Sequence, residues 1–178
     1  MKKKKNYSIE QLLSLSQKEI RKRINNNQKF RKNLGLTSLY WFVHIYFPHY
    51  LKFRTAPFQK EIYKTLEGNE QFIELLAFRE SAKSTITSLF YPIWEIIKGR
   101  YHFILLCSHT GNQVKQLFQN IKLEFENNKL LKKDFGPFAG EEEWTTSSVI
   151  LPKYETKIIG DSVGGSSRGS DLKNIDQI

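Results

Sequence analysis

The sequence has 178 residues, of which 39% are hydrophobic, 13% aromatic and 26% charged, so it has the length of one compact domain and a composition that excludes wholesale disorder. The only cysteine, Cys107, excludes a disulfide framework and a multi-cysteine zinc site. No apolar run reaches the roughly 18 residues of a membrane span, so we expect a soluble cytoplasmic protein with no membrane partner.

Basic residues gather at the N-terminus. Residues 1–34 hold 11 basic and two acidic side chains, which is nearly all of the formal net charge of +10. Apolar residues recur at helical spacing over residues 7–23, and the polar run Asn25–Asn27 predicts a joint within residues 24–34. We expect a basic helical segment, either bound to nucleic-acid phosphates or only solvated, ahead of a domain over residues 35–178.

Helical and strand-like patterns alternate in that domain. The aromatic run Leu39–Pro48 is too short to span a bilayer and too apolar to be exposed, which predicts a buried helix. Phe72–Ala77 is a nearly continuous apolar run, typical of a strand covered on both faces. After a polar turn, Thr85–Ile97 has the spacing of an amphipathic helix, which Pro92 should kink and Gly99 should end.

A second apolar strand, Phe103–Cys107, follows that helix directly. This strand–helix–strand order predicts a right-handed crossover and a parallel sheet flanked by helices, which is an α/β fold. Ser108 and Thr110 come next, at the edge where such sheets bind ligands, although helix capping explains them equally well. Shorter β-like pieces are expected at Ser148–Leu151 and Thr156–Ile159.

The turn after the first expected strand has the spacing of a phosphate-binding loop, G-x-x-x-x-G-K-[ST]. Lys83 and Ser84 fill the last two positions, whereas Ala77 and Ala82 stand where the pattern has glycine. In such loops, backbone N–H groups at a helix N-terminus converge on phosphates, the lysine adds a cation and the hydroxyl holds Mg²⁺. This context favours nucleotide binding, and an ordinary helix start is the alternative.

Several short motifs, in this order and spacing, point to one family. They are Phe47-Pro48, Pro57-Phe58-Gln59, Arg79-Glu80-Ser81-Ala82-Lys83-Ser84-Thr85, Pro92-Ile93-Trp94, Ser108-His109-Thr110, Asp134-Phe135-Gly136 and Ser167-Arg168-Gly169. Over about residues 39–178 the chain resembles the large terminase subunits of tailed bacteriophages, the ATPase motors that package double-stranded DNA into procapsids. The resemblance implies an incomplete P-loop NTPase domain behind a basic helical N-terminal segment.

The resemblance also implies ATP and Mg²⁺ as cofactors. Lys83 would contact the β- and γ-phosphates, Ser84 would hold Mg²⁺, and Arg79 would act as a sensor or transition-state arginine, which makes Arg79 and Lys83 the catalytic pair. Gln59 would read adenine through its amide. The nucleotide-binding set is Gln59, Arg79, Glu80, Ser81, Ala82, Lys83, Ser84 and Thr85, and Arg168 is a candidate contact for DNA or phosphate. A salt bridge from Arg79 to Glu80 and a surface role for Gln59 are the alternatives.

The partners implied are double-stranded DNA, the portal protein and a small terminase subunit, in the cytoplasm of a bacterial host of a phage or prophage. Family members carry an acidic strand soon after the Arg-Gly pair, whereas Asp171–Asp176 is too polar for a buried strand. We therefore expect a truncated or split-gene fragment, without the C-terminal nuclease domain, that binds ATP but does not hydrolyse it at a useful rate. Another P-loop translocase or helicase-like ATPase, and a non-catalytic basic nucleic-acid-binding remnant, are the alternatives.

Overall fold

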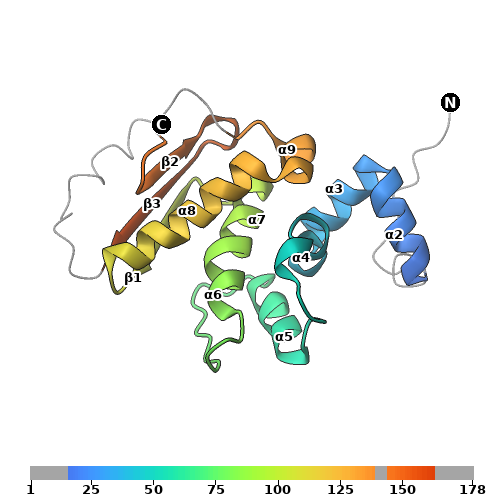
Figure 1. Cartoon of the computed structure of the whole chain (residues 1–178), viewed down its shortest axis with the longest axis horizontal. Coiled ribbons are helices and arrows are strands. Elements are labelled where there is room, and N and C mark those ends of the chain that lie inside the picture. The colour runs from blue at the N-terminus through green and yellow to red at the C-terminus, as the bar shows by residue number, and fades with distance from the viewer. Residues whose placement is uncertain (1–15, 139–143, 163–178) are drawn as a thin grey trace.

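The computed structural model describes residues 16–138 and 144–162 (Figure 1). Helices fill the first part of the chain: α2 (Gln17–Asn26), α3 (Gln28–Thr37), α4 (Leu39–Tyr46), η1 (Pro48–Tyr50), α5 (Pro57–Leu66), α6 (Lys83–Thr85), η2 (Ile86–Phe90) and α7 (Tyr91–Lys98). A mixed α/β part follows: β1 (Phe103–Ser108), α8 (Gly111–Asn127), α9 (Lys129–Phe135), β2 (Ser148–Leu151), η3 (Pro152–Tyr154) and β3 (Thr156–Ser162). α3, α4 and α5 lie on one side of α7, and the sheet lies on the other (Figure 1).

The joint expected within residues 24–34 is a single residue, Asn27. Its side chain accepts a hydrogen bond from the N–H of Phe30 at 3.0 Å and so caps α3, which begins one residue later. The expected division of the chain after residue 34 therefore falls inside α3, where Leu34 and Gly35 are buried. The part of the predicted N-terminal helix before Ser16 lies outside the described residues.

The aromatic run after α3 forms a buried helix, as the sequence predicts. Phe42 and Val43 of α4 are fully buried, and α4 contacts α3, α5 and α7. Glu67, just after α5, accepts a hydrogen bond from the Ser38 hydroxyl at 2.9 Å and so ties α5 to the start of α4. No helix in the described part of the chain is both long and apolar enough to cross a bilayer.

α6, η2 and α7 form one continuous helical run that contains Pro92. Proline has no N–H to donate, and its ring crowds the preceding turn. Here the run widens into the π-helical turn η2 just before α7, which is a known way for a helix to accommodate such a residue. The run ends at Gly99, whose φ of 65° lies in the left-handed region that favours glycine.

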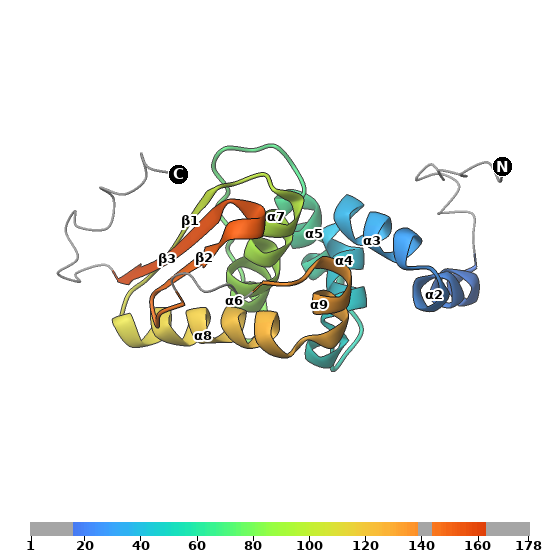
Figure 2. The ribbon, with the colours of Figure 1, turned by 90° about the horizontal axis from the view of Figure 1, so that it is seen from above.

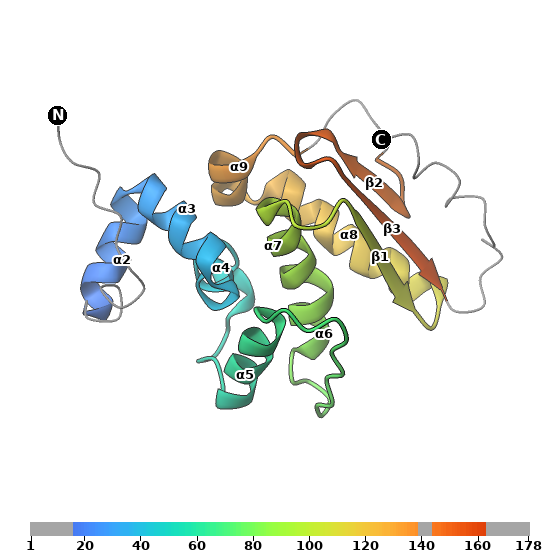
Figure 3. The ribbon, with the colours of Figure 1, turned by 180° about the vertical axis from the view of Figure 1, so that it is seen from behind.

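The sheet has the strand order β1-β3-β2. β1 and β3 are parallel, whereas β2 pairs with β3 in the antiparallel direction. α8 lies along one face of the sheet (Figures 2 and 3). Gly160 on β3 permits this approach, because a Cβ atom there would lie 2.4 Å from Val114 of α8. The structure is therefore α/β with a small mixed sheet, a coarser result than the parallel phosphate-loop sheet that we expected.

The prediction of a strand at Phe72–Ala77 is wrong. This segment is extended but pairs with no described strand, and Phe72 and Leu76 are 92% and 87% exposed. A strand needs a neighbour for its backbone N–H and C=O groups, and the parallel partner of β1 is β3, not this segment. The predicted crossover between residues 72–77 and 103–107 therefore does not exist.

Candidate functional site

The turn before α6 has a strained backbone. Glu80 and Ala82 have φ values of 63° and 61°, which is left-handed backbone that costs a non-glycine residue about 1–2 kcal/mol. Ala82 is the residue directly before α6, at the position where the phosphate-loop pattern has its second glycine. The glycine preference of that pattern thus has a conformational reason here, and local contacts must hold alanine in its place.

The side chains of this turn surround a hollow of about 390 Å³, lined by the consecutive residues 77–85. Neither Arg79 nor Lys83 forms an ion pair within the described chain, and the salt bridge from Arg79 to Glu80 is not formed. Both cations, together with several hydroxyl groups, therefore line a concave surface. That chemistry suits an oxygen-rich anion.

Ser84 fits the role of a Mg²⁺ ligand. It is exposed, it lines the hollow at the second residue of α6, and its hydroxyl makes no hydrogen bond to any described residue. Mg²⁺ in nucleotide sites takes few protein ligands and completes its octahedron with phosphate oxygens and water. A single hydroxyl beside this hollow, with no partner among the described residues, meets that requirement.

A second hollow, of about 230 Å³, lies on another side of the same turn. Residues 50–55 and one side of α5 form its wall, and Glu80, Ala82 and Thr85 line both hollows. The Phe53 ring at this wall is 88% exposed. An exposed ring beside the turn offers a flat apolar surface on which a planar group could stack.

Gln59 contacts the turn directly. Its Oε1 accepts a hydrogen bond from the N–H of Ala56 at 3.0 Å, and its Nε2 donates one to the carbonyl of Ser81 at 3.1 Å. Gln59 is thus not a free surface residue, which was one of the two alternatives. Both ends of its amide already bond to the chain itself.

The turn and the carboxyl end of β1 lie at the same end of the molecule (Figure 3). The connection requires this, because the helical run leads away from the turn and β1 then runs back. At this edge Thr110 caps α8 by accepting from the N–H of Gln113 at 3.4 Å, and Ser108 donates to the Gln113 side chain at 2.9 Å. The capping alternative is therefore confirmed for Thr110, whereas Ser108 bonds to a side chain of α8 and caps no described helix.

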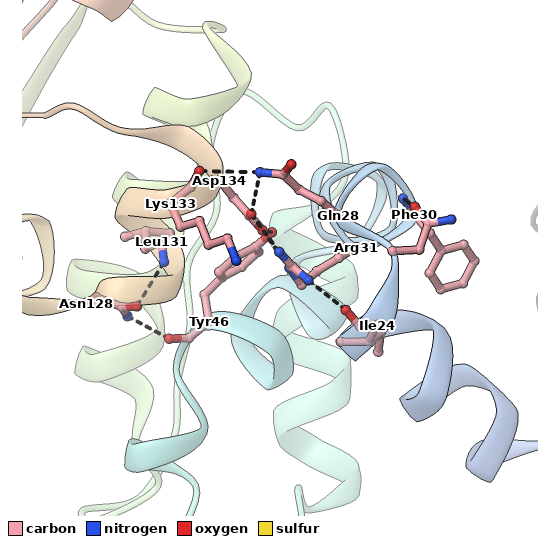
Figure 4. Close-up of polar contacts among 10 residues, drawn as sticks. Ile24, Gln28, Phe30, Arg31, Tyr46, Asn128, Leu131, Lys133 and Asp134 are labelled. Atoms are coloured by element: carbon pink, nitrogen blue, oxygen red, sulfur yellow. Dashed lines mark hydrogen bonds and ion pairs between the residues drawn. The ribbon is translucent and has the colours of Figure 1, made fainter.

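A second polar cluster joins α3 to α9 (Figure 4). The guanidinium of Arg31 donates to both carboxylate oxygens of Asp134, at 2.6 and 2.7 Å. The Tyr46 hydroxyl donates to the same carboxylate at 2.8 Å, and Gln28 donates at 3.0 Å. Burial alone would raise the pKa of the Asp134 carboxyl, but the hydrogen bonds from Arg31, Tyr46 and Gln28 outweigh it and lower that pKa.

This cluster, the α3–α9 junction, also gathers basic side chains. Gln28 donates weakly to the Lys133 carbonyl at 3.4 Å, so the start of α3 lies against the end of α9. The ammonium of Lys32 lies 5.0 Å from the centre of the Phe135 ring. Lys133 is exposed and Lys32 is half-buried, so each helix of the junction carries a lysine that solvent can reach.

Two features of these sites were not visible to sequence reasoning. The wall at residues 50–55 was missed, although the neighbouring Pro57-Phe58-Gln59 motif marks its position along the chain. The pair of Arg31 and Asp134 was missed because 103 positions separate its members. Arg168, the candidate DNA or phosphate contact, lies outside the described residues.

Comparison with known proteins adds no relative: no family model, no curated protein and no solved structure matches this chain.

Proposed function

We propose that the turn Arg79–Thr85 binds the phosphates of ATP together with Mg²⁺. The observation that carries this proposal is that Arg79 and Lys83 form no ion pair with any described residue and both line a hollow of about 390 Å³ on a strained turn. Neither cation is buried and neither is paired with a described carboxylate, so both remain available to a ligand.

Each group has a separate task in this proposal. Lys83, at the first residue of the helical run, supplies a compact positive charge at the helix N-terminus, where the helix dipole favours anions. Arg79 offers a planar guanidinium that can bind two phosphate oxygens at once. Ser84 supplies a hydroxyl for Mg²⁺, which when bound neutralises charge on the phosphates. The second hollow, with the exposed ring of Phe53, leaves room for a base.

The resemblance extends the proposal to the whole protein. We propose that the chain is the N-terminal ATPase part of a terminase large subunit, a motor that packages double-stranded DNA, with the portal protein and a small terminase subunit as partners. Another P-loop DNA translocase or helicase-like ATPase would use the same turn in the same way. The phosphate site is common to both and is therefore tested first.

Titration calorimetry with Mg·ATP tests the site. We expect wild-type protein to bind, and Lys83→Ala to bind about 10- to 100-fold more weakly, because a charged hydrogen bond contributes about 1.5–3 kcal/mol. Lys64→Ala is the matched control, since Lys64 is an exposed lysine on α5 that lines neither hollow. Equal affinity of wild type and Lys83→Ala would refute the proposal.

The α3–α9 junction favours a second function, contact with the phosphate backbone of nucleic acid. Lys32 on α3 and Lys133 on α9 come from distant parts of the chain, and the junction brings their two helices together. A junction with lysines from two segments, in a chain whose residues 1–34 hold nearly all of the net charge, suits contact with a polyanion. This function is compatible with a motor and with a basic nucleic-acid-binding remnant that does not turn over nucleotide.

Substitution tests this better than truncation, because deleting residues 1–34 would remove Arg31 from its buried ion pair. We expect the double variant Lys32→Ala, Lys133→Ala to bind duplex DNA more weakly, with a log–log salt slope reduced by up to about 2. Lys64→Ala again serves as the control. An unchanged slope in the double variant would show that this surface does not contact DNA.

A further inference from the structure

The side chain of Gln59 holds the middle of the turn. Its amide bridges from the N–H of Ala56, at the start of α5, to the carbonyl of Ser81. Ser81 is only 3% exposed and lies between the two left-handed residues, Glu80 and Ala82. A side chain of α5 is thus hydrogen-bonded to the residue that lies between the two left-handed residues of the turn.

This hydrogen bond fixes the direction of the Ala82 N–H group. A peptide group is planar and trans, so its carbonyl and its N–H point in opposite directions. With the Ser81 carbonyl held by Gln59, the N–H of Ala82 points away from Gln59, and no described residue accepts a hydrogen bond from it. Gln59 lines the second hollow and not the first, so this free donor faces away from the Gln59 wall.

Left-handed backbone at non-glycine residues persists only where its surroundings hold it. Within the turn, the Ser81 hydroxyl accepts a long hydrogen bond of 3.4 Å from the N–H of Lys83, and the N–H of Ile86 donates to the Ala82 carbonyl at 3.0 Å. Both of these contacts are local. Among the hydrogen bonds of the described residues, the one from Gln59 is the one that ties Ser81 to a separate element.

We propose that Gln59 is a positioning residue for phosphate binding: it orients the Ser81–Ala82 peptide and does not select the base. This inference rests on the proposed phosphate site. It departs from the base-reading role that the resemblance implies, because each end of the amide already makes a hydrogen bond to the chain, which leaves one N–H and one oxygen lone pair instead of a free amide. The two roles make opposite statements about a ligand that has no base.

Calorimetry with three ligands separates the two roles: Mg·ATP, Mg·GTP and Mg·tripolyphosphate. Gln59→Glu keeps the acceptor for the Ala56 N–H but places an oxygen against the Ser81 carbonyl, so the hydrogen bond to Ser81 is lost. A positioning role predicts that affinity for all three ligands falls by a similar factor, about five- to tenfold for one hydrogen bond. A base-reading role predicts that affinity for ATP falls much further than affinity for tripolyphosphate, which would lose only what the added carboxylate charge costs, and that result would overturn the inference.

Amide hydrogen exchange tests, without any ligand, whether Gln59 holds the turn. We expect faster exchange at residues 80–85 in unliganded Gln59→Glu, with exchange in α8 and α9 unchanged, which shows that the variant is folded. Unchanged exchange at residues 80–85 would overturn the inference even if the phosphate site is real. Conversely, if wild type binds none of the three ligands, the proposed function fails, and the exchange result still decides whether Gln59 holds the turn.

Discussion

The α3–α9 junction and the turn before α6 treat their polar groups in opposite ways. At the junction, the buried Asp134 carboxylate accepts hydrogen bonds from Arg31, Tyr46 and Gln28. In the turn, Arg79 and Lys83 have no acidic partner within the described chain, and the backbone is strained. Both regions are charged, but only the junction is satisfied by the protein itself.

This difference supports a structural role for the buried pair at the junction and the proposed ligand-binding role for the turn. A buried carboxylate with several donors contributes to stability and has no capacity left for a ligand. An exposed turn with free cations and left-handed alanine contributes little to stability, and its strain persists because other contacts hold it. Substitutions of the buried Arg31–Asp134 pair should therefore change folding, and substitutions in the turn should change binding.

The largest effect is expected at the junction. Asp134→Ala leaves the Arg31 guanidinium buried without its partner, since the two side chains are 0% and 6% exposed. Removing one member of a buried pair costs about 3–5 kcal/mol. Urea unfolding followed by circular dichroism measures the loss, with Glu19→Ala on the exposed α2 pair as the control. A loss below 1 kcal/mol would contradict the role that we give this pair.

The same carboxyl should make stability depend on pH. Its pKa in the folded protein lies below its ordinary value of 3.8, so it binds a proton more weakly when folded than when unfolded. Its contribution is therefore complete above about pH 4 to 5 and is lost as the pH falls through the folded pKa. We expect urea midpoints to decrease below pH 4, and to decrease less steeply in Asp134→Asn.

Glu95 is a buried carboxylate like Asp134, but it lacks the hydrogen bonds that Asp134 accepts. It is 1% exposed, and neither carboxylate oxygen has a hydrogen-bond partner among the described residues. Arg100 and Lys98 lie at 3.3 and 3.7 Å, and burial raises the pKa of the carboxyl. We expect Glu95→Gln to change stability by no more than about 1 kcal/mol, in the direction of a gain. Any gain should be larger at pH 8 than at pH 4, because protonation removes the penalty; a loss like that of Asp134→Ala would be the contrary result.

The smallest effect is expected at Ala82. Ala82→Gly relieves left-handed strain of about 1–2 kcal/mol but adds about 0.5–1 kcal/mol of chain entropy to the unfolded state. We expect a net gain of less than about 1 kcal/mol in thermal unfolding, with Mg·ATP affinity retained. Lys64→Gly, in an ordinary helical position on α5, should instead lose about 1 kcal/mol. A loss at Ala82 equal to that at Lys64 would argue against strain in the turn.

Element boundaries were accessible from the sequence because neighbouring residues set them. Thr110 caps α8 and Gly99 ends α7 through contacts a few positions apart, and the apolar composition of the aromatic run indicates that α4 is buried. The chemistry of the turn was also readable, since Lys83 and Ser84 follow directly in a phosphate-loop spacing. The phosphate-binding role itself remains a prediction.

Long-range pairing was decided only by the tertiary structure. Residues 72–77 have the apolar composition of a strand, yet backbone partners are supplied by distant segments, and β1 pairs with β3 instead. Arg31 meets Asp134, and Gln59 meets Ser81, through folding of the whole chain. Sequence periodicity encodes which face of an element is apolar, but the choice of partner depends on how all elements close around one core.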